Sequence, residues 1–291
     1  MTGQLDLDYR RLERLALRYR GGLIGTSSGK RLTNKHGTSL EFADYRPYLP
    51  GDDIRRVDWS LFGRSRRLYT KLNRSEVDAT VNFLLDGSRS MDWGEPNKGI
   101  WAKKLTLALS YLSLRAYDRV AVGLGPKEVS AWLPPVHGRA AFGRVLSFLK
   151  TQDFAREGDL NYLLASFRPI LRPLQLTVII SDFLSPGGYQ EGISQLLRRR
   201  QQLLVFHLAS PDELEPDFRG PVTLTDVETG QKKDVDVDPL LVYRYQQVVQ
   251  EHVGQVRDFC RQRDIPYFPV NTQEEPVDFL LTHGGKIFRT V

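Results

Sequence analysis

Three oxygen-bearing side chains stand at alternate positions directly after an apolar run. In FLLDGSRSMDWG (Phe83–Gly94) the run ends in Asp86, and Ser88 and Ser90 follow. A second apolar run, LTVIISDFL, is interrupted by Asp182. Carboxylates and hydroxyls without a neighbouring His or Cys form a set of hard oxygen ligands, which favours Mg²⁺, Mn²⁺ or Ca²⁺ over zinc. These residues are therefore candidate metal ligands.

The same residues also have a purely structural interpretation. Ser and Asp after a strand often cap the following helix or form turns. An isolated Asp-x-Ser-x-Ser pattern is more often of that kind. The metal interpretation depends on whether Asp182 lies beside the Asp86 segment.

The elements that must position these side chains are strands of a mainly parallel sheet. Three segments, VNFLL, LTVII and LLVFHL, are near-continuous apolar runs, which is typical of strands buried on both faces between helices. Ligands of such open sheets bind beyond the carboxyl ends of the strands. Two strands end in aspartate there, so we expect Asp86, Ser88, Ser90 and Asp182 to converge at one rim of the sheet.

Strands and helices alternate from about residue 79 onward, as an α/β fold requires. The apolar patterns predict strands at 79–86, 119–125, 127–134, 174–182, 202–210 and 265–270, and a hairpin over 220–238 that turns at 228–230. They predict helices at 7–20, 99–117, 140–150, 160–167, 189–199, 240–263 and 276–282.

Composition narrows the class of protein. Of 291 residues, 41% are hydrophobic and 26% charged, as in ordinary globular proteins. Cys260 is the only cysteine, which excludes an internal disulfide and a Cys-based zinc site. The first residues lack the apolar core of a signal peptide, and no apolar run reaches the ~20 residues that cross a bilayer. We therefore expect a cytoplasmic protein without a membrane span.

Positive charge is concentrated in the first quarter of the chain. The net charge is +6, and the basic excess lies within residues 1–75, whereas the remainder is nearly neutral. Such asymmetry can indicate nucleic-acid or membrane contact. Acidic residues interleave with the arginines, however, and no nucleic-acid-binding motif accompanies them. Nucleic acid is therefore an unfavoured partner.

Two motifs resemble known families. Asp86-Gly-Ser-Arg-Ser-Met91 resembles the metal-ion-dependent adhesion site (MIDAS) of von Willebrand factor type A domains, whose later aspartate is matched by Asp182. EFADYRPYLPGDDIRRVDW (Glu41–Trp59) resembles the signature of the bacterial family DUF58, whose members carry it just upstream of a type A-like domain. The resemblance implies a Rossmann-like, mainly parallel sheet flanked by helices at 76–291, with a basic extension, 1–75, packed on it.

One ligand of the resembled site is missing. Type A domains also use a threonine, often within Gly-Thr-Asp-Leu, and here the matching segment reads Glu157-Gly-Asp-Leu160. Gly158 therefore stands at the threonine position. The resemblance implies Mg²⁺ or Mn²⁺ as the ion, with three alternatives: one ligand fewer, replacement by Asp159 or water, or a relic site.

The signature segment has two interpretations. As a partner-binding surface it would use Glu41, Arg46, Asp52, Asp53, Arg55, Asp58 and Trp59. As a structural element its charged residues, with Asp44 and Arg56 among them, would form an ion-pair network that holds the segment on the sheet, and Trp59 and Phe62 would be its hydrophobic anchor. Isolated exposed ion pairs contribute only ~0–1 kcal/mol each.

No residues visible in the sequence carry catalysis. The five histidines are scattered, His207 lies inside an apolar strand as a core residue would, and the common nucleophile and phosphate-binding motifs are missing. We expect a non-enzymatic interaction protein. The DUF58 resemblance implies an adaptor that works with a MoxR-type AAA+ ATPase and an unknown protein client. The alternatives are a metal-dependent hydrolase using Asp86 and Asp182, and a nucleic-acid-binding protein using the basic segment.

Overall fold

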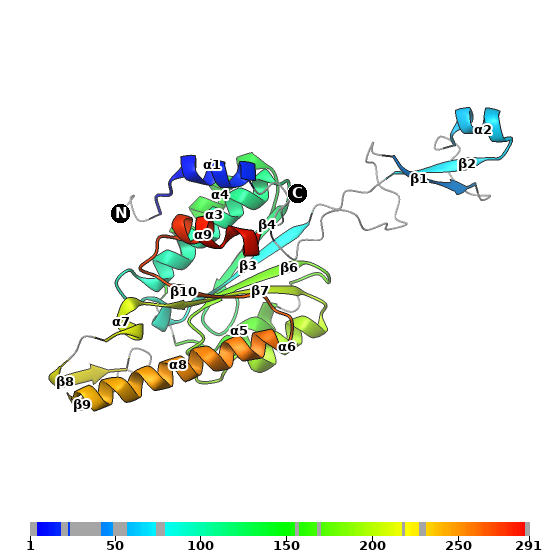
Figure 1. The fold of residues 1–291 in the computed structure, drawn as a ribbon. Coiled ribbons are helices and arrows are strands. Elements are labelled where there is room, and N and C mark those ends of the chain that lie inside the picture. Colours follow the sequence, from blue (N-terminus) through cyan, green and yellow to red (C-terminus); the bar gives the residue numbers. More distant parts are fainter. Residues whose placement is uncertain are drawn as a thin grey trace. The chain divides into compact units, whose positions relative to one another are not determined.

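The chain forms two compact units, which are described separately (Figure 1). The computed structural model describes residues 5–18, 23, 42–48, 57–73, 79–154, 157–167, 170–216, 219–226 and 231–288. One unit comprises Met1–Thr26 together with Thr80–Val291, and the other comprises Ser27–Ala79.

A six-stranded sheet forms the centre of the larger unit. Its strands are β3 (Thr80–Asp86), β4 (Arg119–Gly125), β5 (Ala131–Val136), β6 (Leu176–Ser181), β7 (Gln202–Ala209) and β10 (Tyr267–Asn271), in the order β10-β7-β6-β3-β4-β5. Every neighbouring pair is parallel except β4 and β5. β3 and β6 are buried along their whole length. The mainly parallel α/β fold expected from the sequence is confirmed.

Helices cover both faces of this sheet (Figure 1). α1 (Tyr9–Arg18), α3 (Lys98–Arg115), α4 (Phe142–Lys150) and α9 (Pro276–Ile287) lie on one face, and α5 (Leu160–Phe167), α6 (Gln190–Arg198) and α8 (Pro239–Arg261) lie on the other. Side chains of a strand alternate between the two faces. Accordingly, Phe83 and Leu85 join the core beneath α3, whereas Leu84 joins the core beneath α5 and α6.

Helix α1 belongs to the larger unit that contains the sheet. The prediction from the sequence placed it with the signature segment in the extension 1–75. Its Leu12 and Leu15 are buried in the core shared with α3 and α9. Arg11 forms an ion pair with Asp278 of α9. These contacts explain why the helix packs with the sheet rather than with the residues that follow it.

One predicted helix is longer in the structure, and the predicted hairpin forms at its expected place. Helix α9 continues to Ile287 instead of ending near Thr282. Gly284 and Gly285 disfavour a helix intrinsically, but Gly284 and Ile287 continue the buried face of Leu280, so packing outweighs propensity. The predicted hairpin forms as β8 (Gly220–Thr225) paired with β9 (Lys232–Val237), while its turn at 228–230 lies outside the described residues.

In the described part of the smaller unit, two paired strands flank one short helix in the sequence. β1 (Phe42–Pro47) pairs antiparallel with β2 (Tyr69–Asn73), and α2 (Trp59–Ser65) lies between them in the sequence. The Asp58 carboxylate caps α2 by accepting the backbone N–H groups of Ser60 and Leu61 at 2.9 and 3.0 Å. Across both units, none of the described helices is long and apolar enough to cross a membrane.

Candidate functional site

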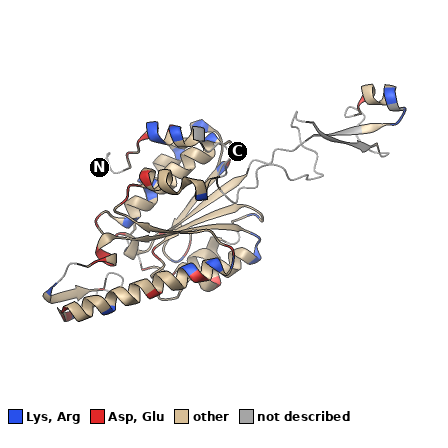
Figure 2. Ribbon diagram, in the orientation of Figure 1, with Lys and Arg blue, Asp and Glu red and all other residues tan. Residues whose placement is uncertain are grey.

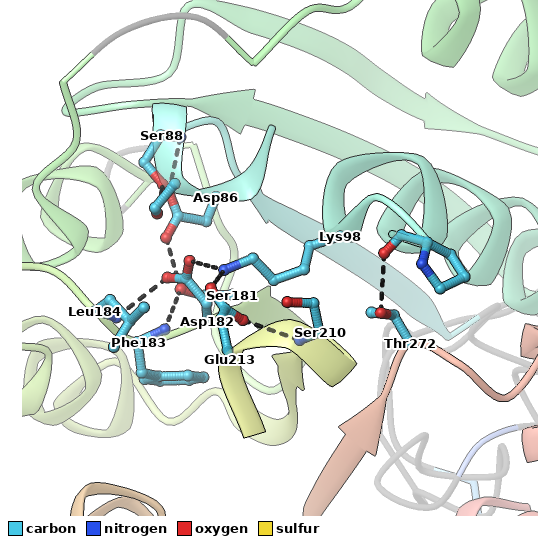
Figure 3. Close-up of polar contacts among 12 residues, drawn as sticks. Asp86, Ser88, Lys98, Ser181, Asp182, Phe183, Leu184, Ser210, Glu213 and Thr272 are labelled. Carbon is cyan, nitrogen blue, oxygen red and sulfur yellow. Dashed lines mark hydrogen bonds and ion pairs between the residues drawn. The ribbon is translucent and has the colours of Figure 1, made fainter. Parts of the chain in front are cut away.

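The ends of β3 and β6 bring two aspartates to one edge of the sheet. The strands are parallel neighbours in which Leu85 pairs with Ile180, so Asp86 is level with Ser181 and Asp182 follows directly. The Ser181 hydroxyl donates a 2.6 Å hydrogen bond to Asp86 Oδ2, as Figure 3 shows. Asp86 and Asp182 are both buried.

The two serines of the motif complete a continuous set of oxygen contacts at this edge. The Ser88 backbone N–H donates to Asp86 Oδ1 at 2.9 Å, and the Ser88 and Ser90 hydroxyl oxygens are 3.0 Å apart. The Ser88 side chain also bonds to Asp86, and the Ser90 side chain bonds to Asp182. The structure therefore brings together four of the five predicted metal ligands, and we call Asp86, Ser88, Ser90 and Asp182 the rim site.

A short helical turn fixes the serines in this position. Ser88 has an extended backbone and precedes a single 3-10 turn, η2 (Arg89–Met91). The Met91 side chain is completely buried in the core, which anchors the turn. In the structure the turn and its buried methionine hold Ser90 beside Ser88.

The two carboxylates have different electrostatic environments. Burial and, to a smaller extent, the nearby Asp182 raise the pKa of Asp86 to about 6, against the opposing hydrogen bonds from Ser181 and Ser88. Burial would also raise the pKa of Asp182, but the Lys98 ammonium and hydrogen bonds from Leu184 N–H and Ser90 hold that pKa below its ordinary value. Asp86 is thus the carboxylate whose charge is least compensated.

Lys98 is a member of this cluster that the sequence did not reveal. Its Nζ donates to Asp182 Oδ2 at 2.8 Å and also forms an ion pair with Glu213 of α7 (Pro211–Leu214), as Figure 3 shows. The Lys98 side chain is 0% exposed. A signal was present, because Lys98 is the first residue of α3, where the helix dipole disfavours a positive charge. A lysine there needs acidic partners.

Glu213 is placed by the local structure after β7. The chain leaves β7 at Ser210, and the Ser210 backbone N–H donates to Glu213 Oε2 at 2.9 Å. The Ser-x-x-Glu spacing is that of a helix capping box, a pattern readable from the sequence. The Glu213 carboxylate accepts the Ser210 N–H with Oε2 and forms the ion pair with Lys98 through Oε1.

His207 lies behind the rim site and is part of the core. Its Nδ1 is 2.8 Å from the Tyr267 hydroxyl, and its ring packs edge-on against Phe183 and His252. Burial, with a smaller effect of His252, lowers the pKa of His207 to about 4. The imidazole is therefore neutral near pH 7.

Gly158 and Asp159 lie on the loop before α5. A Cβ atom added to Gly158 would be 2.4 Å from the Ser88 Cβ, so this backbone passes directly against the rim site. Asp159 Oδ1 accepts the Tyr162 N–H at 3.1 Å, which caps α5. A Cβ at Gly187 would be 2.3 Å from Asp159 Oδ2, so that carboxylate packs on the Gly187 backbone. The contacts of Asp159 are thus those of a helix cap.

The rim site has the donor chemistry of a small hard cation. Two ligands at right angles around Mg²⁺, each ~2.1 Å from the ion, lie ~3 Å apart, which matches the separation of the two serine oxygens, 3.0 Å. The incompletely compensated Asp86 charge would also be stabilised by a cation. Among the described residues, no three His, Cys, Asp or Glu side chains form a metal-binding group. The donors that fit are two carboxylates and two hydroxyls.

The predicted partner-binding residues of the signature segment are only partly described. Glu41, Asp52, Asp53, Arg55 and Arg56 lie outside the described residues, and only the backbone of Arg46 is described, opposite Thr70. Asp58 is buried as the cap of α2.

Both described aromatic residues of α2 are exposed within the smaller unit. Trp59 is 59% exposed and Phe62 is 38% exposed. Their rings form an edge-to-face pair with centroids 6.1 Å apart. Within the smaller unit the two rings are thus available for contact, and their role as a hydrophobic anchor on the sheet stays a prediction.

The fold and the strand-end residues define an α/β protein of the von Willebrand factor type A-like class. The chain itself belongs to the family described as "Protein of unknown function DUF58", whose model matches residues 44–255. This family is the one that the Glu41–Trp59 signature indicated.

Relatives with similar sequences share most of their length with this chain. "Uncharacterized protein Rv1480" of Mycobacterium tuberculosis (strain ATCC 25618 / H37Rv) is 25% identical over 269 residues, covering 91% of this chain and 84% of the relative. "Uncharacterized protein Mb1516" of Mycobacterium bovis (strain ATCC BAA-935 / AF2122/97) has the same identity and coverage.

Two solved structures also resemble the chain. One is the conserved hypothetical protein BatB from Bacteroides thetaiotaomicron, with 13% identity and a TM-score of 0.43. The other is an aerotolerance-related membrane protein from Bacteroides fragilis NCTC 9343, with 15% identity and a TM-score of 0.45. Each alignment covers 72% of this chain and 99% of the solved chain.

Proposed function

We propose that this protein is a non-enzymatic interaction module that holds Mg²⁺ or Mn²⁺ at the rim site and uses the ion to dock an acidic side chain of a partner protein. The observation that carries the proposal is the continuous set of contacts from Asp86 through Ser88 and Ser90 to Asp182 at the carboxyl edge of the sheet. By its family, the proposed partner is a MoxR-type AAA+ ATPase, for which this chain serves as adaptor to a protein client.

Asp86, Ser88 and Ser90 are the residues that would hold the ion, with Asp182 supporting them through Ser90. Mg²⁺ usually keeps several waters and uses few protein ligands. Its remaining positions can therefore accept a carboxylate from outside. That chemistry is binding and needs no acid or base from the protein.

The ionisable groups next to the rim site favour docking over catalysis. A catalytic ion needs a positioned base or nucleophile with a suitable pKa beside it. Lys98 is engaged by two carboxylates, and His207 is buried and bonded to Tyr267. Both groups therefore have structural partners that occupy their polar atoms.

The exposed aromatic pair of the smaller unit supports a second contact region. Exposed Trp and Phe side chains next to one another are typical of protein-binding surfaces. Trp59 and Phe62 are such a pair, on a helix whose N-terminus is fixed by Asp58. We therefore include Trp59 in the proposed partner-binding surface.

The proposal is tested by metal titration and by partner binding in parallel. Calorimetry with MgCl₂ and MnCl₂ should show binding to the unchanged protein and none to Asp86→Ala. The purified MoxR-type ATPase of the same organism should bind the unchanged protein and not Asp86→Ala. Asp86→Ala is used in place of a chelator, because a chelator would also remove Mg²⁺ from the ATPase. Asp153→Ala, a change of an exposed acid in a loop, is the matched control. Undiminished ATPase binding by Asp86→Ala would overturn metal-mediated docking.

A further inference from the structure

Lys98 is a completely buried ammonium that faces the rim site from the protein interior. It contacts Asp182 after β6 and Glu213 on α7, so it joins three elements that are distant in sequence (Figure 3). Burial favours the neutral amine, but the two carboxylates outweigh it and raise the pKa of Lys98 above its ordinary value. The cluster therefore contains a permanent positive charge.

Asp182 is shared between this charge and the rim site. Its Oδ2 accepts from Lys98 at 2.8 Å, and its Oδ1 accepts the Leu184 N–H at 3.1 Å. The Ser90 side chain bonds to the same carboxylate. A positive charge on one side of Asp182 thus lies close to the serine oxygens on the other side.

We propose that Lys98 is a resident cation of the rim site, which stabilises the ion-free protein by neutralising Asp182 and weakens the binding of a divalent cation by repelling it. This inference rests on the proposed function, because it concerns the same ion. An Asp182 without a counter-ion would be a buried unpaired charge, which proteins tolerate poorly. Because Lys98 already supplies a positive charge, Asp182 does not require a metal ion as its counter-ion. The fold can therefore remain intact with and without the ion.

Glu213 provides a test of sign, because it has the opposite charge on the far side of Lys98. If charge governs ion binding, removing the Lys98 charge should strengthen it and removing the Glu213 charge should weaken it. Charges in a partly buried site interact by ~1 kcal/mol or more, and 1.4 kcal/mol corresponds to tenfold in affinity. We therefore expect changes of about tenfold, in opposite directions. A purely structural role would not produce opposite signs.

The experiment is calorimetric titration of MnCl₂ and MgCl₂ into the full chain and its variants. Lys98→Gln keeps a hydrogen-bond donor without the charge and should bind Mn²⁺ about tenfold more tightly. Glu213→Gln keeps an acceptor for Ser210 N–H and should bind about tenfold more weakly. The melting temperature of Lys98→Gln should also rise more on Mn²⁺ addition than that of the unchanged protein. Lys104→Gln, a nearby lysine of the same helix that pairs with Glu275, is the matched control and should change nothing.

The outcomes separate this inference from the proposed function. Ion binding by the unchanged protein with equal affinities in both variants would overturn the role of Lys98 and leave docking intact. Ion binding by Lys98→Gln alone would support the resident cation and overturn metal docking by the natural chain. No binding by any variant would overturn both. If Lys98→Gln does not fold, the double variant Lys98→Gln/Glu213→Gln takes its place, because it removes one charge of each sign. Its Mn²⁺ affinity should return to that of the unchanged protein. Comparison with Glu213→Gln alone then still shows whether removing the Lys98 charge strengthens ion binding.

Discussion

Gly158 lies against Ser88 so closely that a Cβ atom on Gly158 would be 2.4 Å from the Ser88 Cβ. Real Cβ atoms do not approach one another to that distance. Glycine stands where the type A domains have threonine. It is thus required by the path of this loop, whose backbone packs against the rim site.

Introducing the threonine should therefore damage the site rather than complete it. Gly158→Thr should lower the free energy of unfolding by about 1–3 kcal/mol, because overpacking shifts the loop or Ser88. It should not improve Mn²⁺ binding. Gly158→Ala should show the same direction, whereas Gly143→Ala, where nothing lies within 4 Å, should be neutral or stabilising. Chemical denaturation measures each change, and a more stable Gly158→Thr protein with tighter Mn²⁺ binding would contradict this account.

Phe183 has a left-handed backbone, with φ at 58°, directly after Asp182. Its ring is buried against Tyr189 and His207. Phe183→Ala should cost about 3–5 kcal/mol through lost packing. Phe183→Gly should be no less stable than Phe183→Ala, since glycine adopts positive φ without strain.

The matched pair is at Phe206, a buried residue of β7. There the glycine variant should be less stable than the alanine variant by about 0.5–1 kcal/mol, because glycine loses more conformational freedom in a strand. Urea denaturation of the four variants decides the comparison. The same order of stability at both positions would show that the backbone at Phe183 is not under constraint.

His207 should make stability depend on pH in the mildly acidic range. Its pKa is about 4 in the folded protein and about 6.5 when unfolded, so the unfolded state binds more protons between these values. The contribution of His207 to stability should consequently fall as the pH drops from 6.5 toward 4, by roughly 3.5 kcal/mol at most at 1.4 kcal/mol per unit. Asp86, whose pKa is raised to about 6 in the folded protein, contributes in the opposite direction over the same range.

His207→Phe should remove this contribution and leave that of Asp86, so the stability of the variant should fall less than that of the unchanged protein, or rise, as the pH drops. The variant also leaves the Tyr267 hydroxyl without its partner and lowers stability at pH 7. The measurement is urea denaturation at several pH values, with His137→Gln on the surface as the comparison. Equal slopes for His207→Phe and the unchanged protein would exclude His207 as the titrating group.

Cys260 should be unreactive while the protein is folded. It is buried on the inner face of α8, and burial raises the pKa of its thiol to about 12. The thiolate is the reactive form, so a thiol reagent at pH 8 should modify it only as fast as the chain opens. Because it is the only cysteine, its modification reports directly on opening. Rapid stoichiometric labelling of the folded protein would contradict the buried position.

The sequence identified the strands of the rim site because their signal is strong. β3, β6 and β7 are continuous apolar runs, and an aspartate at the end of a buried strand has little other explanation than the sheet edge. The same reasoning located Ser88 and Ser90, since they follow Asp86 along the chain. It could not find Lys98 and Glu213, whose meeting depends on the tertiary structure. A lysine at the start of a helix and a glutamate in a capping box each have a local interpretation, and only the fold shows that Glu213 and Asp182 share Lys98.

The signature segment could be interpreted much less fully from its sequence. Its composition suggested a charged network with an aromatic anchor, and the order of apolar and polar residues does not specify which side of a short helix is covered. Asp58 was predicted as a binding residue and is a helix cap. Trp59 was predicted as an anchor or a contact, and its exposure within its own unit leaves it available for either role.

The two outer strands of the sheet restrict how a partner can attach. β5 contains Pro134 and Pro135, and β10 contains Pro269. Proline has no N–H to donate, and prolines on an outermost strand prevent another chain from extending the sheet by hydrogen bonding. Recruitment by strand addition is thereby disfavoured on both sides of the sheet. An incoming protein cannot readily lengthen this central sheet, and three prolines thereby suppress the edge-to-edge aggregation that a six-stranded sheet would otherwise allow.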